Sequence, residues 1–156
     1  MNSRSTSRVR LSCGEIEPFV STRGVRQGAP ESPWLYSNFI DSIAEELTRR
    51  GFGVKVGDRR IALLMYADDI VLLSGIVEEL RRMNDVVTEY AYRNRFRLNG
   101  DKSAVMVFGG DRALKDQVER EVWQLSGERV QVKKSYKYLG VDIKTNSADW
   151  RPQWRD

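Results

Sequence analysis

The sequence has no histidine and only one cysteine, Cys13, among its 156 residues. These absences exclude a Cys/His zinc site, a histidine acid or base, and an internal disulfide framework. Any metal that this chain binds must therefore be held by oxygen ligands. Oxygen ligands are typical of Mg²⁺ and Mn²⁺ sites, so these two ions are favoured over zinc.

Long hydrophobic runs are missing as well. No run approaches the length of a membrane span, and residues 1–10 lack the apolar core of a secretory signal. We therefore expect no membrane partner and an intracellular protein, either nuclear or cytoplasmic. Lys and Arg outnumber Asp and Glu by 26 to 22, so the net charge is +4, which mildly favours an anionic partner such as nucleic acid.

Residues 63–73 place two adjacent carboxylates, Asp68 and Asp69, between two apolar runs. Ionised carboxylates in apolar surroundings are costly unless they are compensated, and neighbouring ones repel each other. A bound divalent cation would compensate the charge and offset the repulsion. Strand side chains alternate between faces, so both acids can reach one cation only if the chain turns at them. We expect a strand over 60–67 and a returning strand over 70–73. The alternative is an Asp-Asp turn in a plain hairpin, and without a cation the turn should be mobile.

Two stretches, residues 33–50 and 76–95, have the apolar spacing of helices. Ser32 and Pro33 form a favourable helix start, with the serine hydroxyl as the expected cap, and Gly51 is a favourable stop. The apolar stripe of the first helix consists of Leu35, Phe39, Ile43 and Leu47, flanked by Ile40 and Ala44. The stripe of the second consists of Ile76, Leu80, Met83, Val87 and Tyr90.

The remaining apolar segments have the pattern of short strands joined by turns. Strand pairs are expected at 9–13 with 16–21, 52–56 with 60–67, 96–98 with 103–108, and 122–125 with 130–132, with one more strand over 136–143. Residues 111–122 fit either a short helix or a surface loop, and residues 1–7 are expected to be disordered. The pattern predicts an α+β fold, in which two long helices pack on one face of an antiparallel sheet.

Four motifs follow one another in the chain. They are Gly-Val-Arg-Gln-Gly-Ala-Pro-Glu-Ser-Pro at 24–33, Tyr-Ala-Asp-Asp at 66–69, Arg-Leu-Asn-Gly-Asp-Lys-Ser at 97–103 and Tyr-Lys-Tyr-Leu-Gly-Val at 136–141. Together they resemble the palm of reverse transcriptases, particularly those of retrotransposons without long terminal repeats and of group II introns. The resemblance covers residues 8–143, implies a partial right-hand polymerase, and leaves 144–156 as a truncated or unstructured tail.

The resemblance implies nucleotide addition by two Mg²⁺ ions, with Mn²⁺ as an alternative. It makes Asp68 the direct bridging ligand, whereas Asp69 either binds the metal or supports it by charge and hydrogen bonds. Lys102 matches a lysine that protonates the departing pyrophosphate as a general acid. A surface lysine in a turn is the simpler alternative for this residue.

The resemblance also implies contacts to substrates. Template and nucleotide contacts fall on Arg26, Gln27, Gly28, Tyr66 and Ala67, of which the small Ala67 would let the primer end approach. Alternatives remain open for three of these residues. Arg26 fits a solvated charge, Gly28 fits a turn that only aims the following helix, and Tyr66 fits a core aromatic.

Primer contacts are implied for Tyr138, Leu139 and Gly140, in the segment 136–141 that resembles the family's primer-gripping hairpin and also fits an ordinary edge strand. The implied partners of a complete enzyme are an RNA template, a DNA primer and deoxynucleoside triphosphates. The sequence gives no indication of the oligomeric state.

Two departures from the family pattern stand out. Glu31 occupies a place where the family has an apolar residue, so an acid stands beside the template loop. The family's earlier catalytic motif, of the kind Asp-x-x-x-Ala-Phe-Asp, has no counterpart before Arg26, and neither Asp41 nor Asp58 has the spacing to replace it. The fingers region is missing too. We therefore predict a retroelement polymerase fragment that is inactive alone, or a decayed, non-catalytic palm that binds nucleic acid.

Overall fold

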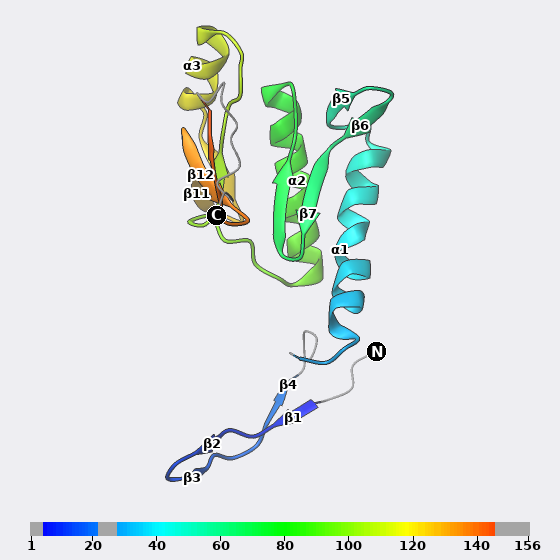
Figure 1. Cartoon of the computed structure of the whole chain (residues 1–156), viewed down its shortest axis with the longest axis vertical. Helices are drawn as coiled ribbons and strands as arrows, with labels where there is room; N and C mark the ends of the chain where they lie inside the picture. The colour runs from blue at the N-terminus through cyan, green and yellow to red at the C-terminus, as the bar shows by residue number, and fades with distance from the viewer. Residues whose placement is uncertain (1–4, 22–27, 146–156) are drawn as a thin grey trace, which may run out of the picture.

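The computed structural model describes residues 5–21 and 28–145. Its described part is an α+β fold with three helices, α1 (Ser32–Arg49), α2 (Val77–Asn94) and α3 (Arg112–Arg120) (Figure 1). The strands are β1 (Ser5–Ser7), β2 (Arg10–Leu11), β3 (Gly14–Glu15), β4 (Phe19–Ser21), β5 (Val54–Val56), β6 (Arg59–Ile61), β7 (Leu63–Tyr66), β8 (Asp69–Leu72), β9 (Ala104–Val105), β10 (Trp123–Leu125), β11 (Glu128–Val132), β12 (Ser135–Tyr138) and β13 (Val141–Lys144).

The first core joins α1, α2 and the β7–β8 hairpin. Ile43 and Leu47 of α1 and Met83 of α2 are completely buried in it, and burial of each such side chain stabilises the fold by about 1.5–3 kcal/mol. The inward side chains of the hairpin pack against the same core, and these are Leu63, Met65, Ile70 and Leu72. The two long helices therefore cover one face of this hairpin, as the sequence predicted.

The buried polar end of this core is satisfied internally. The Tyr90 hydroxyl donates to the carbonyl oxygen of Phe39 and lies 2.6 Å from the Ser42 hydroxyl oxygen. The rings of Phe39, Tyr90 and Phe96 meet edge to face or tilted, with centroids 5.8–6.0 Å apart. This aromatic group fixes α1 against the end of α2.

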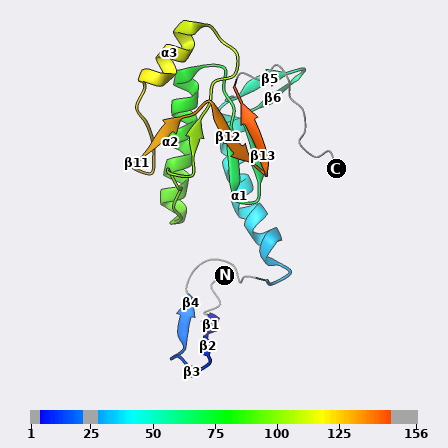
Figure 2. The same cartoon turned by 60° about the vertical axis from the view of Figure 1, so that its left-hand side comes forward.

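A second core lies on another side of α2, where α3 and a three-stranded sheet pack. Val77 of α2, Val118 of α3, Trp123 of β10 and Val130 of β11 are buried together there. The Asn84 side-chain amide also donates to the Gln124 carbonyl oxygen at 2.7 Å. Helix α2 thus joins the two cores, which places the β7–β8 hairpin and the α3 region on one rigid element (Figures 1 and 2).

The prediction of one antiparallel sheet was wrong for the described residues. They form five separate two-stranded antiparallel sheets and one three-stranded sheet of order β10–β11–β9, in which β9 and β11 run parallel. The predicted pairing of 96–98 with 103–108 is also absent from the described part of the chain. Partly buried Val105 and Val107 pack instead against the second core, and this burial draws the segment to β11.

The segment 5–21 forms a double-hairpin arm that projects beyond the end of α1, as Figures 1 and 2 both show. Strands β1 and β4 pair, and β2 and β3 pair across a turn at Ser12 and Cys13. Residues 5–7 are therefore a strand, where disorder was expected. The turn also lies two residues earlier than the Gly14-Glu15 turn that the sequence suggested.

Both long helices begin differently from their predicted starts. Glu31 is the N-cap of α1 and makes no side-chain capping bond, whereas Ser32 is buried as the first helical residue. The expected serine cap was therefore wrong. Ile76 is the N-cap of α2 and is exposed, because the buried apolar face of this helix starts at Val77.

Candidate active site

The two adjacent carboxylates lie at the tip of the β7–β8 hairpin. The strands pair with Leu63 opposite Leu72 and Tyr66 opposite Asp69, so Ala67 and Asp68 form a two-residue turn. The turn was predicted one residue later, at Asp68 and Asp69. Residues 66–69 are called the aspartate turn below.

Ala67 adopts a left-handed backbone conformation, with φ of 51°. A positive φ at the first turn residue suits the twist of a tight hairpin, but a residue with a Cβ pays roughly 1–2 kcal/mol for it. Strain of this kind is tolerated where the surrounding structure fixes the chain. Here the fixed part is the four-residue ladder on the apolar underside of the hairpin.

The pleat of the hairpin sorts its side chains into two faces. Leu63 and Met65 face the core, whereas Leu64 and Tyr66 are exposed, and the Tyr66 residue is 66% accessible. Tyr66 and Asp69 are directly opposite in register, so their side chains share the exposed face. The core alternative for Tyr66 is therefore wrong.

Asp68 and Asp69 are both exposed. Leu63, Met65, Ile70 and Leu72 pack against the first core and not around the acids, so the carboxylates are not buried as the sequence suggested. No hydrogen bond or ion pair reaches either carboxylate from residues 5–21 or 28–145. The two acids are therefore accessible to a ligand from solvent.

Tyr36 of α1 is a neighbour of this turn that the sequence did not reveal. The pKa of its phenol is raised, first by partial burial and second by the negative charge of Asp68. Tyr36 also packs against the first core. Tyr36, near the N-terminal end of α1, therefore lies close enough to Asp68 for the two groups to interact electrostatically. The helical stripe alone did not indicate this proximity.

The base of the hairpin is clamped by polar contacts. The Gly53 amide donates to Glu79 Oε1 at 2.9 Å, and the Leu73 amide donates to the Ala62 carbonyl oxygen at 2.7 Å. A Cβ on Gly53 would lie 2.3 Å from the Ile61 carbonyl oxygen, so only glycine allows this approach. Rigidity at the base contrasts with the open tip.

Lys102 lies in a second turn, residues 99–103, called the lysine turn below. The Lys102 amide donates to Asn99 Oδ1 at 3.0 Å, and the Ser103 amide donates to the Gly100 carbonyl oxygen at 3.0 Å. Lys102 itself is exposed. The sequence placed a turn here correctly, but the strand pairing expected around it is not formed, because β9 pairs with β11 instead.

The predicted primer residues occupy a hairpin of their own. Strands β12 and β13 pair with Tyr138 opposite Val141, so Leu139 and Gly140 form the turn, with φ of 49° and 83°. Both turn residues are exposed, and Tyr138 is partly buried. The single strand that the local pattern predicted over 136–143 is therefore wrong, whereas a hairpin, as the family resemblance implies, is present.

Of the three template residues predicted in the first motif, only Gly28 lies among the described residues. Arg26 and Gln27 lie outside the described residues. Gly28 is described, is exposed and has φ of 82°, which favours glycine, and space around it is open because an added Cβ would meet nothing within 4 Å. This geometry fits both the template contact and the simple turn.

The aspartate turn has the donor chemistry for a hard divalent cation, since it offers two exposed carboxylates and no competing nitrogen or sulfur ligand. Within residues 5–21 and 28–145, however, no group of three acidic or other metal-binding side chains comes together. The described residues therefore bring two carboxylates together at this turn and no third metal-binding side chain.

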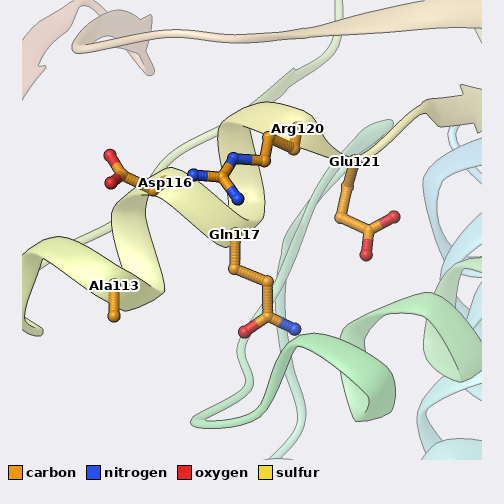
Figure 3. Close-up of a pocket in the computed structure, with 5 residues that line it drawn as sticks. All are labelled: Ala113, Asp116, Gln117, Arg120 and Glu121. Carbon is orange, nitrogen blue, oxygen red and sulfur yellow. The ribbon is translucent and has the colours of Figure 1, made fainter.

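A shallow hollow of about 430 Å³ lies on α3, at the far end of the body from the aspartate turn (Figures 1 and 3). Its lining residues are Ala113, Asp116, Gln117, Arg120 and Glu121. The lining carries both negative and positive side chains, and Glu121 is already paired with Arg81 of α2. The hollow lacks the acidic pair and shares no residue with the predicted site.

None of the helices in the described part of the chain has the length and apolar character to span a membrane. Residues 3–143 match the family described as reverse transcriptase (RNA-dependent DNA polymerase). This match includes both the aspartate turn and the lysine turn.

Individual relatives agree with this match. The chain is 34% identical over 103 residues, 65% of its length, to the transposon TX1 uncharacterized 149 kDa protein of Xenopus laevis. It is 34% identical over 63% of its length to the Pol polyprotein of the type-1 retrotransposable element R2 of Popillia japonica. It is 30% identical over 81% of its length to that of the type-2 element R2DM of Drosophila melanogaster. The matched segment makes up only 8–13% of these relatives.

Proposed function

The chain belongs to the reverse transcriptase (RNA-dependent DNA polymerase) family, and we propose that it is the palm segment of a retroelement polymerase. The observation that carries this proposal is the β7–β8 hairpin, which presents Asp68 and Asp69 to solvent at a rigid-based tip. In a complete enzyme this tip would face a primer end, an RNA template and a deoxynucleoside triphosphate.

Each residue of the tip has a part in the proposed site. Asp68 and Asp69 supply carboxylate oxygens for the divalent cations, Mg²⁺ first and Mn²⁺ second. Such ions, when bound, activate the primer hydroxyl and stabilise charge on the triphosphate. Tyr66 lines the same face as Asp69, and the small side chain of Ala67 leaves room for the primer end.

Two further groups contribute from other elements. Lys102 is the proposed proton donor to departing pyrophosphate, because an ammonium group on an exposed turn can approach a phosphate and release a proton to it. Gly28, together with Arg26 and Gln27, is proposed to contact the template and the nascent base pair. The Leu139-Gly140 turn is proposed to support the primer strand.

We also propose that the 156-residue chain does not polymerise by itself. A two-metal site needs a carboxylate on each side of the ions, and these 156 residues contain no counterpart of the earlier aspartate motif. The same absence supports a second candidate, a decayed palm that keeps the fold and binds nucleic acid without catalysis.

Primer extension on an RNA template with Mg²⁺ tests the proposal. The purified chain should give no extension, and a longer polypeptide that adds the upstream aspartate motif and fingers should extend the primer. Asp68→Ala in the longer polypeptide should then lower the rate by roughly 10³-fold or more. Asp58→Ala, an exposed turn aspartate of the β5–β6 hairpin, is the matched control and should have no effect.

Two results would contradict these statements. Robust extension by the 156-residue chain that disappears in Asp68→Ala would refute its predicted inactivity. Stop codons or frameshifts in the genomic sequence upstream of Met1 would favour the decayed palm over the catalytic one, whereas an open frame with the aspartate motif would favour catalysis.

A further inference from the structure

The lysine turn is held from outside by two side chains, Glu128, which lies in none of the four motifs, and Tyr136, which begins the fourth. Glu128 of β11 and Tyr136 of β12 both bond to its backbone, from positions 28 and 34 residues away in the sequence. We propose that Glu128 and Tyr136 are positioning residues, which fix the backbone from which the Lys102 side chain extends. This inference rests on the proposed role of Lys102 toward phosphate.

Glu128 acts through its carboxylate. Its Oε2 accepts the Gly100 amide hydrogen at 2.8 Å, and its Oε1 accepts from Arg97 Nη2 at 2.7 Å. The Arg97 side chain is 80% exposed, so that ion pair is solvated and contributes little. The bond to the Gly100 amide is different, because Gly100 is buried and its N–H would otherwise lack a partner among the described residues.

The absence of a side chain at position 100 makes this contact possible. A Cβ built on Gly100 would lie 2.5 Å from the Cβ of Glu128 and 3.0 Å from its Oε2. The backbone at Gly100 does not have a positive φ, so conformational freedom is not what requires glycine there. The requirement is space for the glutamate, which links the Asn-Gly motif of the turn to β11.

Tyr136 acts on the other end of the turn. Its hydroxyl donates to the carbonyl oxygen of Lys102 itself, while its ring lies under the Lys133 ammonium group at 5.7 Å from the ring centroid. Lys133 is in turn anchored, because its amide donates to the Val105 carbonyl oxygen at 2.9 Å. The turn is therefore tied at Gly100 and at Lys102, on either side of Asp101, to one three-stranded sheet and its neighbour.

A fixed backbone matters for a group that must meet a phosphate. A lysine side chain is long and flexible, so the position of its ammonium group depends on where the backbone places the start of the side chain. General acid catalysis requires the donor within hydrogen-bond reach of the accepting oxygen. Two ties from separate strands keep the turn from swinging away, at no cost to the reach of the ammonium group.

Amide hydrogen exchange in the 156-residue chain, measured by NMR, tests the ties directly. Glu128→Ala should speed exchange at the Gly100 amide by roughly tenfold or more, since an accepting oxygen is lost. Glu128→Gln keeps one side-chain oxygen and should restore most of the protection. Tyr136→Phe removes only the hydroxyl and should raise fast backbone motion at Lys102.

The control is Glu119→Ala. Glu119 is an exposed glutamate of α3 to which no hydrogen bond or ion pair extends from any described residue. Glu119→Ala should leave the amide exchange of Gly100 and the backbone motion of Lys102 unchanged. Unchanged Gly100 exchange in Glu128→Ala, with the chain still folded, would overturn the inference.

A second measurement separates this inference from the role of Lys102. Titration with pyrophosphate and Mg²⁺ should shift the Lys102 side-chain signals, and both Lys102→Ala and Glu128→Ala should weaken the apparent affinity. If Lys102→Ala leaves the affinity unchanged, the phosphate role of Lys102 is wrong even though the ties exist. If Lys102→Ala weakens binding but Glu128→Ala and Tyr136→Phe do not, the positioning role is wrong.

Discussion

The aspartate turn and the lysine turn differ in what holds them. The lysine turn is tied from outside by side chains of β11 and β12 and inside by Asn99. The aspartate turn has only its own strand ladder and the apolar underside of its hairpin, and no described residue bonds to its carboxylates. One turn is preorganised within this chain, whereas the other carries two adjacent like charges that no described residue compensates.

The difference follows from the chemistry proposed for each turn. Lys102 acts through one flexible cation, so the fold improves its placement by fixing its backbone. Asp68 and Asp69 would act as ligands, and ions held by carboxylates on both sides would themselves fix the turn. A chain that lacks the opposite carboxylate therefore leaves this turn less constrained than the lysine turn.

The largest expected effect comes from weakening the first core, on which both strands of the aspartate turn's hairpin pack. Met83→Ala leaves a cavity in the first core beneath β7 and β8, and should lower the free energy of unfolding by about 2–5 kcal/mol. Urea denaturation measures this loss. Hydrogen exchange should then rise in β7 and β8 more than in the lysine turn, which is also tied to β11 and β12 by Glu128 and Tyr136.

Met106→Ala is the matched control for that change. Met106 is partly exposed and belongs to neither buried cluster, so its truncation should cost much less. Equal loss of protection in both turns after Met83→Ala would show that the two turns share one cooperative unit, and the proposed contrast between them would fail.

The backbone of the aspartate turn gives the next largest effect. Ala67→Val places a β-branched residue at φ of 51° and should destabilise the fold by about 1–2 kcal/mol, measured by thermal or urea unfolding. Ala67→Gly removes the steric strain but adds freedom to the unfolded chain, so its net effect should be small. A valine variant as stable as the parent would contradict the left-handed turn.

Local patterns in the sequence predicted the parts of the fold that local forces decide. The apolar spacing gave α1 and α2 within one or two residues at each end, and Gly57-Asp58 and Ser126-Gly127 gave their hairpins correctly. Residue pairs far apart in the sequence were missed. The contact of Glu128 with Gly100 and the approach of Tyr36 to Asp68 depend on packing across α2 and α1, for which no local periodicity exists.

The same reason explains the wrong hairpin around Asn99. Asn-Gly is a strong turn signal, and the turn does form, but the flanking Val105 gains more by burial in the second core than by pairing with residues 96–98. Of the candidate site, the sequence predicted the hairpin and its two adjacent acids, but it suggested apolar surroundings for acids that are exposed. It did not predict which side chains hold the lysine turn.

Removing a carboxylate charge should change the free energy of unfolding in opposite directions at the two turns. Asp68→Asn relieves repulsion between neighbouring carboxylates, so at low salt and without a divalent cation it should raise the free energy of unfolding by a few tenths of a kcal/mol. Glu128→Gln should lower it slightly, because it weakens the tie to Gly100. Unfolding at low and high salt checks both, since only the first effect should fade with screening. Destabilisation by Asp68→Asn would mean that the charge is already compensated.

The smallest expected effect reports how closely α1 approaches the aspartate turn. The pKa of Tyr36 is raised above 10.0 by burial and by the charge of Asp68, so the folded chain holds this proton more tightly than the unfolded chain does. The resulting stability is fully present below about pH 10 and is lost as the pH rises through the folded pKa. Absorbance of the phenolate, compared between the parent and Tyr36→Phe, isolates this one tyrosine. Asp68→Asn should lower its pKa only part of the way toward the ordinary value, because burial is the larger cause. If Asp68→Asn leaves the Tyr36 titration unchanged, the hairpin tip does not lie beside the N-terminal end of α1. The aspartate turn would then have no neighbour on α1.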